Sequence, residues 1–448
     1  MKKTVAVLIT ILIFAVSFPS KAAAAEELGL PPFPEIESPN IVLMDADSGE
    51  VLFQKNGDKK CYPASTTKLL TALLTIENTP LSEKIVFSEN AVKSISPGDA
   101  NAKISAGEEL TTEQALYCLM LRSANEVAYG IAEHVGGTIS NFSSMMNDRV
   151  AALGAKDTHF SNPSGLTDEF HYTTAYDMAL IARECFNNKT LMNILGFKGT
   201  YTIAKTNKSN FIRYYEHRFL MTNSDSRFYY EYSKGGKTGY TDAAGNCLVS
   251  FAEKDGLRLI CSVMNSTDAG RYSDSIALFE YYFNNYKKIS IDDLDDAISS
   301  SGPDVFKLAN SITNNKELNI YFEDNSYLLV PKRVKKTGLQ TIVTYADNPG
   351  YSGKEGGFAC LSFFYQGVGV GNATVYIESR NSKIIPGTNG VVRFDNSLPD
   401  TTEKIIYINI FILIGCVIGI SGLAAFIVYK VKNRKPRFGF KSTKKLHF

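Results

Sequence analysis

One short motif places a serine and a lysine where the lysine could activate the serine. Ser65 and Lys68 are three residues apart, at the expected start of a helix. Residues at this spacing lie on one side of a helix. A serine is a weak nucleophile until a base takes its proton, and a lysine can be that base only where burial or a neighbouring cation lowers its pKa. The helix N-terminus would also present backbone N–H groups to the oxygen that becomes negative.

A second motif, Ser123-Ala124-Asn125, lies within an apolar stretch that we predict to be helical. Polar side chains in such a stretch need partners, because an unpaired buried polar group costs roughly 1–3 kcal/mol. Ser123 could relay a proton, and Asn125 could orient Lys68 and a substrate amide. A capping pair or a satisfied core pair would give the same pattern. Ser38-Pro39-Asn40 and Ser88-Glu89-Asn90 repeat the pattern, so it is uninformative alone.

A third motif, Lys237-Thr238-Gly239, follows two glycines and precedes Tyr240 and an expected strand. Lys and Thr on a strand edge can hold a carboxylate, and the glycine lets a ligand approach the backbone. Lys336-Thr337-Gly338 repeats this motif without leading glycines, and we favour Lys237 over Lys336. Ser442 and Lys445 repeat the spacing of Ser65 and Lys68 in a basic tail, and we favour the earlier pair.

The three motifs in this order are typical of penicillin-binding proteins and class A β-lactamases. The chain further resembles the low-molecular-mass D-alanyl-D-alanine carboxypeptidases, serine peptidase family S11, closely over residues 35–290 and loosely over 290–380. The segments that carry the resemblance are Tyr62–Lys68, Ser123–Glu126, Glu133–Gly137, Met146-Asn147, Thr158–Phe160, Asn162–Leu166 and Lys237–Thr241.

This resemblance implies a serine-type D-Ala-D-Ala carboxypeptidase that removes the terminal D-alanine from peptidoglycan stem pentapeptides. Ser65 would form the acyl-enzyme, Lys68 would be the general base, and Ser123 would relay the proton to the leaving D-alanine. β-Lactams would acylate Ser65 and remain bound. Metals, cofactors and nucleic acid are not expected. The substrate would contact Asn125, Lys237, Thr238, Gly239, Tyr240 and Arg271, with the backbone N–H groups of Ser65 and Tyr240 as the oxyanion hole.

Two alternatives were weighed against this interpretation. A β-lactamase of the same fold would need a Glu-x-x-Leu-Asn element, which is absent between Asn162 and Ala175. A non-catalytic, cell-wall-binding membrane protein would not need the complete set of motifs. Whether Lys68 or another group is the acylation base stays open. A vegetative role and a sporulation role also stay open.

The surrounding pattern predicts the elements that must position these residues. Alternation over 41–53 around Asp47-Ser48-Gly49 indicates a hairpin. Helices are expected over 67–75, 112–135, 176–185 and 273–286, and strands over 245–252 and 257–264. This order predicts an α+β, β-lactamase/transpeptidase-like catalytic domain over residues 30–287, with an antiparallel sheet, helices packed on it and a helical subdomain.

A small all-β domain is expected over residues 288–383, followed by a stalk over 384–404. Its predicted strands are short and separated by turn residues. They cover residues 319–322, 327–330, 340–345, 360–365 and 373–377.

The charge distribution predicts a membrane protein. Of the 47 Lys and Arg, three lie in residues 1–25 and eight in residues 430–448, which contain no Asp or Glu, so residues 26–429 carry a net charge of −10. Residues 1–25 are predicted to be a signal peptide. Residues 405–429 are long and apolar enough for a transmembrane helix. The basic tail would stay in the cytoplasm and place the catalytic domain on the outer side of a bacterial cell membrane.

The cysteines and histidines show no metal-binding spacing. Six cysteines lie in the exported part, and free, buried thiols are favoured over disulfides, with Cys247 and Cys261 the pair to consider if one exists. Cys61, just before the nucleophile segment, is expected to be inert rather than redox-sensitive. The other exported cysteines are Cys118, Cys185 and Cys360.

Overall fold

The computed structural model describes residues 28–217, 219–294, 318–322, 326–346, 352–354 and 356–379. The predicted signal peptide, stalk, transmembrane helix and tail lie outside these ranges. Within the described ranges, every helix is too short or too polar to cross a bilayer.

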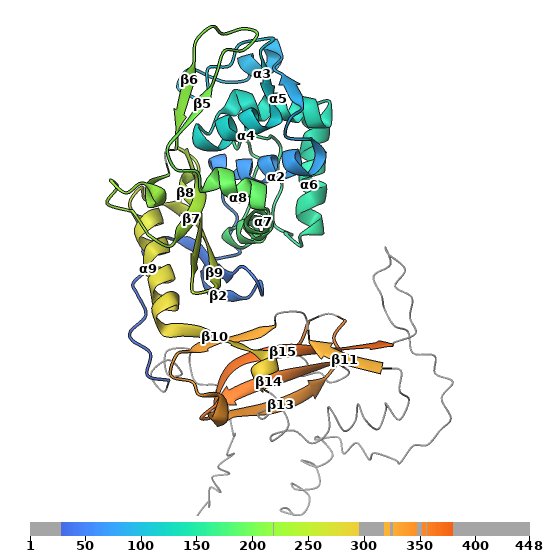
Figure 1. The fold of residues 1–448 in the computed structure, drawn as a ribbon, viewed down its shortest axis with the longest axis vertical. Coiled ribbons are helices and arrows are strands. Elements are labelled where there is room, and N and C mark those ends of the chain that lie inside the picture. Colours follow the sequence, from blue (N-terminus) through green and yellow to red (C-terminus); the bar gives the residue numbers. More distant parts are fainter. Residues whose placement is uncertain are drawn as a thin grey trace, which may run out of the picture. The chain divides into compact units, whose positions relative to one another are not determined.

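A five-stranded antiparallel sheet, in the order β2-β1-β9-β8-β7, forms the framework around the predicted site residues (Figure 1). The predicted hairpin is present as β1 and β2, and β1 also pairs with β9 from the other end of the domain. β7 lies at the edge of this sheet, so one side of its backbone stays outside the strand pairing. The strands are β1 (Asn40–Asp45), β2 (Val51–Lys55), β7 (Ser233–Thr241), β8 (Gly245–Lys254) and β9 (Leu257–Ser266).

Both faces of the sheet are covered by helices, which confirms the expected mixed architecture. Alternate residues of β1 point to opposite faces: Val42 belongs to the core on one side and Leu43 to the core on the other. Helix α9 (Gly270–Asn285) packs on the Leu43 side, and the remaining larger helices lie on the other (Figure 1). These are α2 (Lys68–Asn78), α4 (Thr112–Leu121), α5 (Asn125–Gly136), α6 (Ile139–Ala152), α7 (Ala175–Asn187) and α8 (Lys189–Leu195).

Smaller elements complete the helical block. Two small two-stranded antiparallel sheets, β3 with β4 and β5 with β6, belong to this part of the fold. The elements are β3 (Lys84–Val86), α3 (Glu89–Lys93), β4 (Glu109–Thr111), β5 (Thr200–Ile203) and β6 (Arg213–Glu216).

The prediction of one continuous helix over 112–135 is wrong, because the segment forms two helices. α4 ends at Leu121, α5 begins at Asn125, and Ser123 between them has φ +55°, a region that few residues other than glycine adopt. Leu121 and Ala124 are both buried, so the apolar pattern continues across the break and hides it. Ser123 therefore lies at a break between helices, and Asn125 is the first residue of α5.

The C-terminal described residues form the β-strands that the sequence predicts, with one addition. Helix α9 ends at Asn285 and passes directly into a strand that was not predicted, β10 (Tyr286–Ser290), which pairs with β12. The other strands make a sheet in the order β11-β15-β14-β13. Their bounds are β11 (Leu318–Phe322), β12 (Tyr327–Pro331), β13 (Leu339–Tyr345), β14 (Ala359–Tyr365) and β15 (Val368–Ser379).

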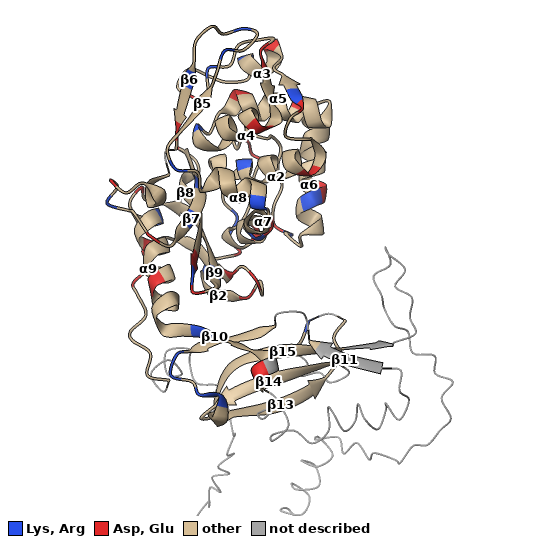
Figure 2. Cartoon of the chain, viewed as in Figure 1, with Lys and Arg blue, Asp and Glu red and all other residues tan. Residues whose placement is uncertain are grey.

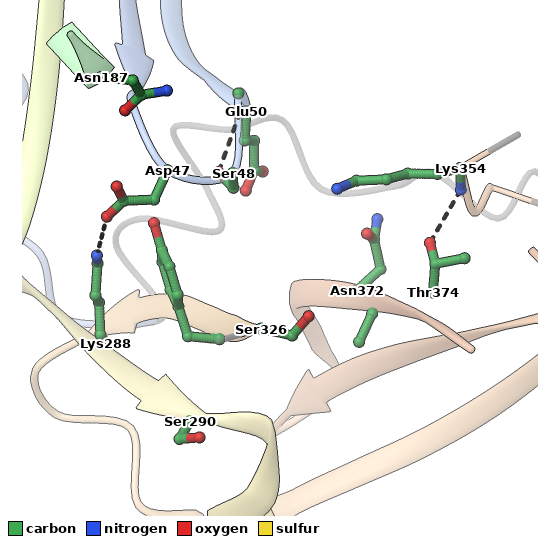
Figure 3. Close-up of a pocket in the computed structure, with 13 residues that line it drawn as sticks. Asp47, Ser48, Glu50, Asn187, Lys288, Ser290, Ser326, Lys354, Asn372 and Thr374 are labelled. Carbon is green, nitrogen blue, oxygen red and sulfur yellow. Dashed lines mark hydrogen bonds and ion pairs between the residues drawn. The ribbon is translucent and has the colours of Figure 1, made fainter. Parts of the chain in front are cut away.

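A cavity of about 890 Å³ lies between the β1–β2 turn and these C-terminal strands (Figure 3). Asp47 at its rim binds Lys288 at 2.6 Å and Arg258 at 2.7 Å. The hydroxyl of Tyr327 donates to the buried carboxylate of Asp45 at 2.5 Å. The predicted catalytic residues are not part of its lining. Its Lys288 pairs with Asp47, and we assign the cavity to the contact between β10–β12 and the larger sheet.

The six described cysteines are free thiols, as predicted. Cys247 belongs to the core beneath the helical block and Cys261 to the core beneath α9, so the two side chains point to opposite faces of the sheet. Burial raises the pKa of the Cys61 thiol to about 12, and the neighbouring Cys247 acts in the same direction. A thiol held in its protonated form reacts slowly with oxidants and alkylating agents.

Candidate active site

Ser65 and Lys68 make the contact that their spacing predicts. Ser65 lies in a 3-10 turn, η1 (Ala64–Thr67), and Lys68 is the first residue of α2. Lys68 is fully buried, and its Nζ donates to Ser65 Oγ at 2.9 Å. The turn leaves Ser65 partly exposed while the helix takes Lys68 into the core. This geometry pairs an accessible hydroxyl with a buried amine.

The surroundings of Lys68 favour its neutral form. Nζ also donates to Asn125 Oδ1 at 2.7 Å and to the backbone carbonyl of Ser164, so its polar contacts are satisfied. Burial lowers the pKa of Lys68 well below its ordinary value, and the charge of Lys237 adds to this effect, whereas Glu126 and Asp99 oppose it. A desolvated lysine that has lost its proton can accept one from a serine.

The carbonyl of Ser164 is a site group that the sequence analysis missed. It belongs to the Asn162–Leu166 segment, which carried family resemblance but no assigned role. Asn162 Oδ1 accepts from the backbone N–H of Ser164 at 3.1 Å and of Gly165 at 2.8 Å, which fixes the turn. The Asn-Pro-Ser-Gly composition indicates a turn. It does not reveal the contact with Lys68, because Ser164 and Lys68 are 96 residues apart in the sequence.

Gly165 allows a prediction with a matched control. Its φ is +86°, and a Cβ there would lie 1.8 Å from the carbonyl oxygen of Ala64. Gly154 has φ +78° but open space around a Cβ. We expect Gly154→Ala to cost roughly 1–2 kcal/mol of stability, from backbone strain alone. Gly165→Ala should cost roughly 1–3 kcal/mol more and slow acylation of Ser65, because the clash must displace η1. Denaturant unfolding and penicillin labelling would measure both effects, and equal behaviour of the two variants would contradict this account.

Lys237 and Ser123 form a second lysine–serine pair opposite the first. Lys237 on β7 donates from Nζ to Ser123 Oγ at 3.0 Å and to its neighbour's carbonyl, that of Thr238, at 2.8 Å. Burial lowers the pKa of Lys237 to about 7, and the charge of Arg271 adds to the effect. The left-handed conformation of Ser123 thus places its hydroxyl at a lysine from a strand 114 residues away.

The remaining predicted residues lie along and behind β7. A Cβ on Gly239 would come within 2.9 Å of the backbone nitrogen of Ser65, so the strand passes close to the nucleophile because residue 239 is glycine. Thr238 is half-buried, and Tyr240 is 60% exposed. Arg271 comes from α9 and donates to the carbonyls of Gly239 and Cys247, both at 3.3 Å. Its guanidinium therefore contacts the backbone of β7 and β8.

A buried histidine near the nucleophile was also missed. His171 Nδ1 accepts from the backbone N–H of Ser161 at 3.1 Å, which leaves Nε2 to donate to Thr67 Oγ1 at 2.9 Å. Burial lowers the pKa of His171 to about 3, so it is neutral near pH 7. The hydrogen bond to Thr67 holds the last residue of η1 in position. No group of three or more potential metal ligands occurs among the described residues.

The local charge of the site differs from that of the surface. Figure 2 shows Lys and Arg interspersed with Asp and Glu over the described elements. At the site, Lys237 and Arg271 are the basic side chains beside β7, and both are buried or nearly so. A carboxylate that enters here would meet the charge of Arg271 and, while it is protonated, that of Lys237. The second Lys-Thr-Gly copy, Lys336–Gly338, forms an exposed 3-10 turn.

Comparisons with known proteins point to a single family. The D-alanyl-D-alanine carboxypeptidase family model matches residues 25–268. The carboxypeptidase DacF of Bacillus subtilis is 33% identical over 258 residues, 56% of this chain and 63% of DacF, so the chain spans less than two thirds of that relative. DacA of Escherichia coli K12 is 28% identical over 60% of this chain and 67% of its own length.

Solved structures give the same result. The D-alanyl-D-alanine carboxypeptidase DacD of Francisella tularensis is similar with a TM-score of 0.59 and 25% identity, over 77% of this chain and 94% of that one. The Streptomyces K15 DD-transpeptidase is similar with a TM-score of 0.52 and 28% identity, over 56% of this chain and 98% of its own.

Proposed function

The chain belongs to the D-alanyl-D-alanine carboxypeptidase family, and from this premise we propose that it is a serine-type carboxypeptidase that removes the terminal D-alanine from peptidoglycan stem pentapeptides. The observation that carries the proposal is the 2.9 Å contact between the buried amine of Lys68 and the hydroxyl of Ser65, beside the free edge of β7. A family member without this contact could bind wall peptides but would form an acyl-enzyme only slowly.

In the proposed acylation step, Lys68 Nζ takes the proton of Ser65 as Oγ attacks the carbonyl between the two D-alanines. The backbone N–H groups of Ser65 and Tyr240 stabilise the oxyanion. The proton that Lys68 has taken returns through Ser123 to the nitrogen of the departing D-alanine, so that Lys68 and Ser123 end the step as they began it, while the contact with Lys237 at 3.0 Å holds the Ser123 hydroxyl in place. Water then hydrolyses the ester and returns Ser65 to its free form. A β-lactam would acylate Ser65 by the same attack.

The free edge of β7 supports recognition of an extended peptide. An edge strand offers unpaired backbone groups to which a peptide can add as a further strand. Lys237 and Thr238 would hold the terminal carboxylate, and Asn125 would hold the amide. The positive charge of Arg271 would add to the attraction for the carboxylate, although it lowers the pKa of Lys237. A stem peptide with an amidated C-terminus tests this arrangement: kcat/KM should fall by roughly 10²-fold or more, since a charge-assisted bond to carboxylate is lost. Equal turnover of both peptides would contradict it.

The two lysines predict a bell-shaped pH dependence of kcat/KM. Loss of the proton from Lys68, whose pKa burial lowers well below its ordinary value, activates Ser65 and gives the acid limb. Loss of the proton from Lys237, whose pKa is about 7, weakens binding of the carboxylate and gives the alkaline limb. A bound carboxylate stabilises the charged lysine, so the alkaline limb of kcat should lie at higher pH than that of kcat/KM. Initial rates on a stem peptide over pH 5–10 measure both limbs, and a kcat/KM that keeps rising to pH 10 would contradict this assignment.

We also propose that the protein is exported and held in the membrane by a single C-terminal helix over residues 405–429. The apolar run of 25 residues and the eight basic residues that follow support this topology. The lipid bilayer is then a partner, and the catalytic domain lies outside. Removal of residues 405–448 should release the protein from the membrane fraction with penicillin labelling intact. Release of the full-length chain by high salt alone would contradict a spanning helix.

A further inference from the structure

Glu126 is a buried carboxylate beside the site to which the proposed mechanism gives no role. It is the second residue of α5, directly after Asn125, and is 1% exposed. Its Oε1 accepts from the backbone N–H of Ala102 at 2.6 Å and of Ile104 at 3.4 Å. Its Oε2 is buried without a hydrogen-bond partner. An ionised group held with one oxygen unpaired is costly.

The contacts of Glu126 hold one segment of chain, residues 99–104, against the start of α5. The carbonyl of Ala100 accepts from the backbone N–H of Asn125 at 2.8 Å. On its other side the segment is held by Tyr215 of β6, whose hydroxyl donates to the carbonyl of Ala102 at 2.8 Å. Glu126 and Asn125 are adjacent, and Asn125 also binds Lys68. The segment and the general base are thus joined through two successive residues of α5.

The charge of Glu126 also acts on Lys68. The groups that face Lys68 are Lys237, Glu126, Asp99 and the neutral His171. Lys237 favours the neutral amine, whereas both carboxylates favour the charged one. Asp99 is half-buried and its effect is more strongly screened by water. On its own far side Glu126 faces the thiol of Cys118, near the Glu108–Arg213 ion pair. Burial raises the pKa of Glu126 above its ordinary value, and the backbone N–H groups of Ala102 and Ile104 oppose this effect only in part.

We propose, on the basis of the proposed function, that Glu126 is a positioning residue: its carboxylate fixes the 99–104 segment against α5, and its negative charge sets the acid side of the pH range in which Ser65 is acylated. The substitution Glu126→Gln separates these two effects. The amide oxygen of glutamine can still accept from Ala102 and Ile104, but the charge is gone. Glu126→Ala removes both the charge and the contacts.

The test is the second-order rate of covalent labelling by benzylpenicillin between pH 4.5 and 9, with kcat/KM for a stem pentapeptide measured alongside. For Glu126→Gln we expect the acid limb to move to lower pH by roughly half to one unit, because loss of the negative charge makes Lys68 easier to deprotonate. Glu126→Ala should show the same shift and a fall in peptide kcat/KM of about tenfold or more, because the segment is no longer held.

Glu108→Gln is the matched control. Glu108 is also fully buried and binds a backbone N–H, that of Ser105 at 3.0 Å, but it pairs with Arg213 and does not act on Lys68. This variant should lose thermal stability and keep the acid limb of the wild type. If Glu126→Gln superimposes on the wild type over the whole pH range, or shifts only as far as Glu108→Gln does, the inference is overturned while the proposed function stands. If the wild type is not labelled at any pH, both the proposed function and this inference are overturned.

Discussion

Replacement of Ser65 by Ala is expected to reduce release of D-alanine from a stem pentapeptide by at least about 10⁴-fold, because no other hydroxyl can take its place in covalent catalysis. Ser123 is the nearest alternative in the site, but its hydroxyl binds Lys237 and not Lys68. Covalent labelling by penicillin should vanish with the same substitution. Reversible binding of the peptide should remain, since Asn125 and Lys237 are untouched.

The chain contains a matched control for this substitution. Ser442 and Lys445 repeat the spacing of Ser65 and Lys68 in the basic tail. We expect Ser442→Ala to keep wild-type turnover and labelling in the full-length protein. Thermal unfolding of the Ser65→Ala variant would show whether it is folded. A folded Ser65→Ala variant that still releases D-alanine or still binds penicillin covalently would show that the nucleophile lies elsewhere.

Replacement of Lys68 by Met is expected to lower the acylation rate by roughly 10²–10⁴-fold, the usual contribution of a general base. Methionine fills a buried cavity of similar length and carries no proton acceptor. The variant leaves Asn125 Oδ1 and the carbonyl of Ser164 without the amine that binds them. Unpaired groups cost roughly 1–3 kcal/mol each, but burial of a polar amine is avoided, so the loss of stability should be modest. The slow residual acylation should lose the acid limb of the pH profile.

Lys68→Arg separates the base from the charge. A guanidinium stays protonated at any accessible pH, so this variant keeps a cation but cannot accept a proton. It should be as slow as Lys68→Met. Acylation of either folded variant within tenfold of the wild-type rate would mean that another group, such as Glu126 acting through water, takes the proton of Ser65. Stopped-flow labelling with a fluorescent penicillin measures these rates over the required range.

Some of this site follows from sequence spacing alone. Ser65 and Lys68 meet because residues three apart share one side of a helix, and the structure has their contact at 2.9 Å. The hairpin around Asp47-Ser48-Gly49 and the strands that became β8 and β9 also follow from local alternation and turn residues. The choice of Lys237 over Lys336 rested on the glycines before it, and Gly236 does pack tightly, with a Cβ there only 2.5 Å from the carbonyl oxygen of Val249.

The rest depends on contacts that no local pattern contains. The break at Ser123 is hidden because buried Leu121 and Ala124 continue the apolar stretch, and the partner of the Ser123 hydroxyl, Lys237, is 114 residues away in the sequence. The carbonyl of Ser164 and the carboxylate of Glu126 act through the backbone or through space, so residue type and spacing do not reveal them. The strand β10 follows α9 without turn residues between them. It was not predicted, because its conformation depends on its pairing with the distant strand β12.

The most direct test of the central claim is to locate the acyl group. The wild-type protein would be incubated with benzylpenicillin, digested, and its peptides analysed by tandem mass spectrometry. The account predicts one equivalent of penicilloyl group per chain, attached to the Oγ of Ser65 in the peptide that contains Tyr62–Lys68. An adduct on Ser123, Lys237 or any other residue, or no adduct on a folded protein, would contradict it.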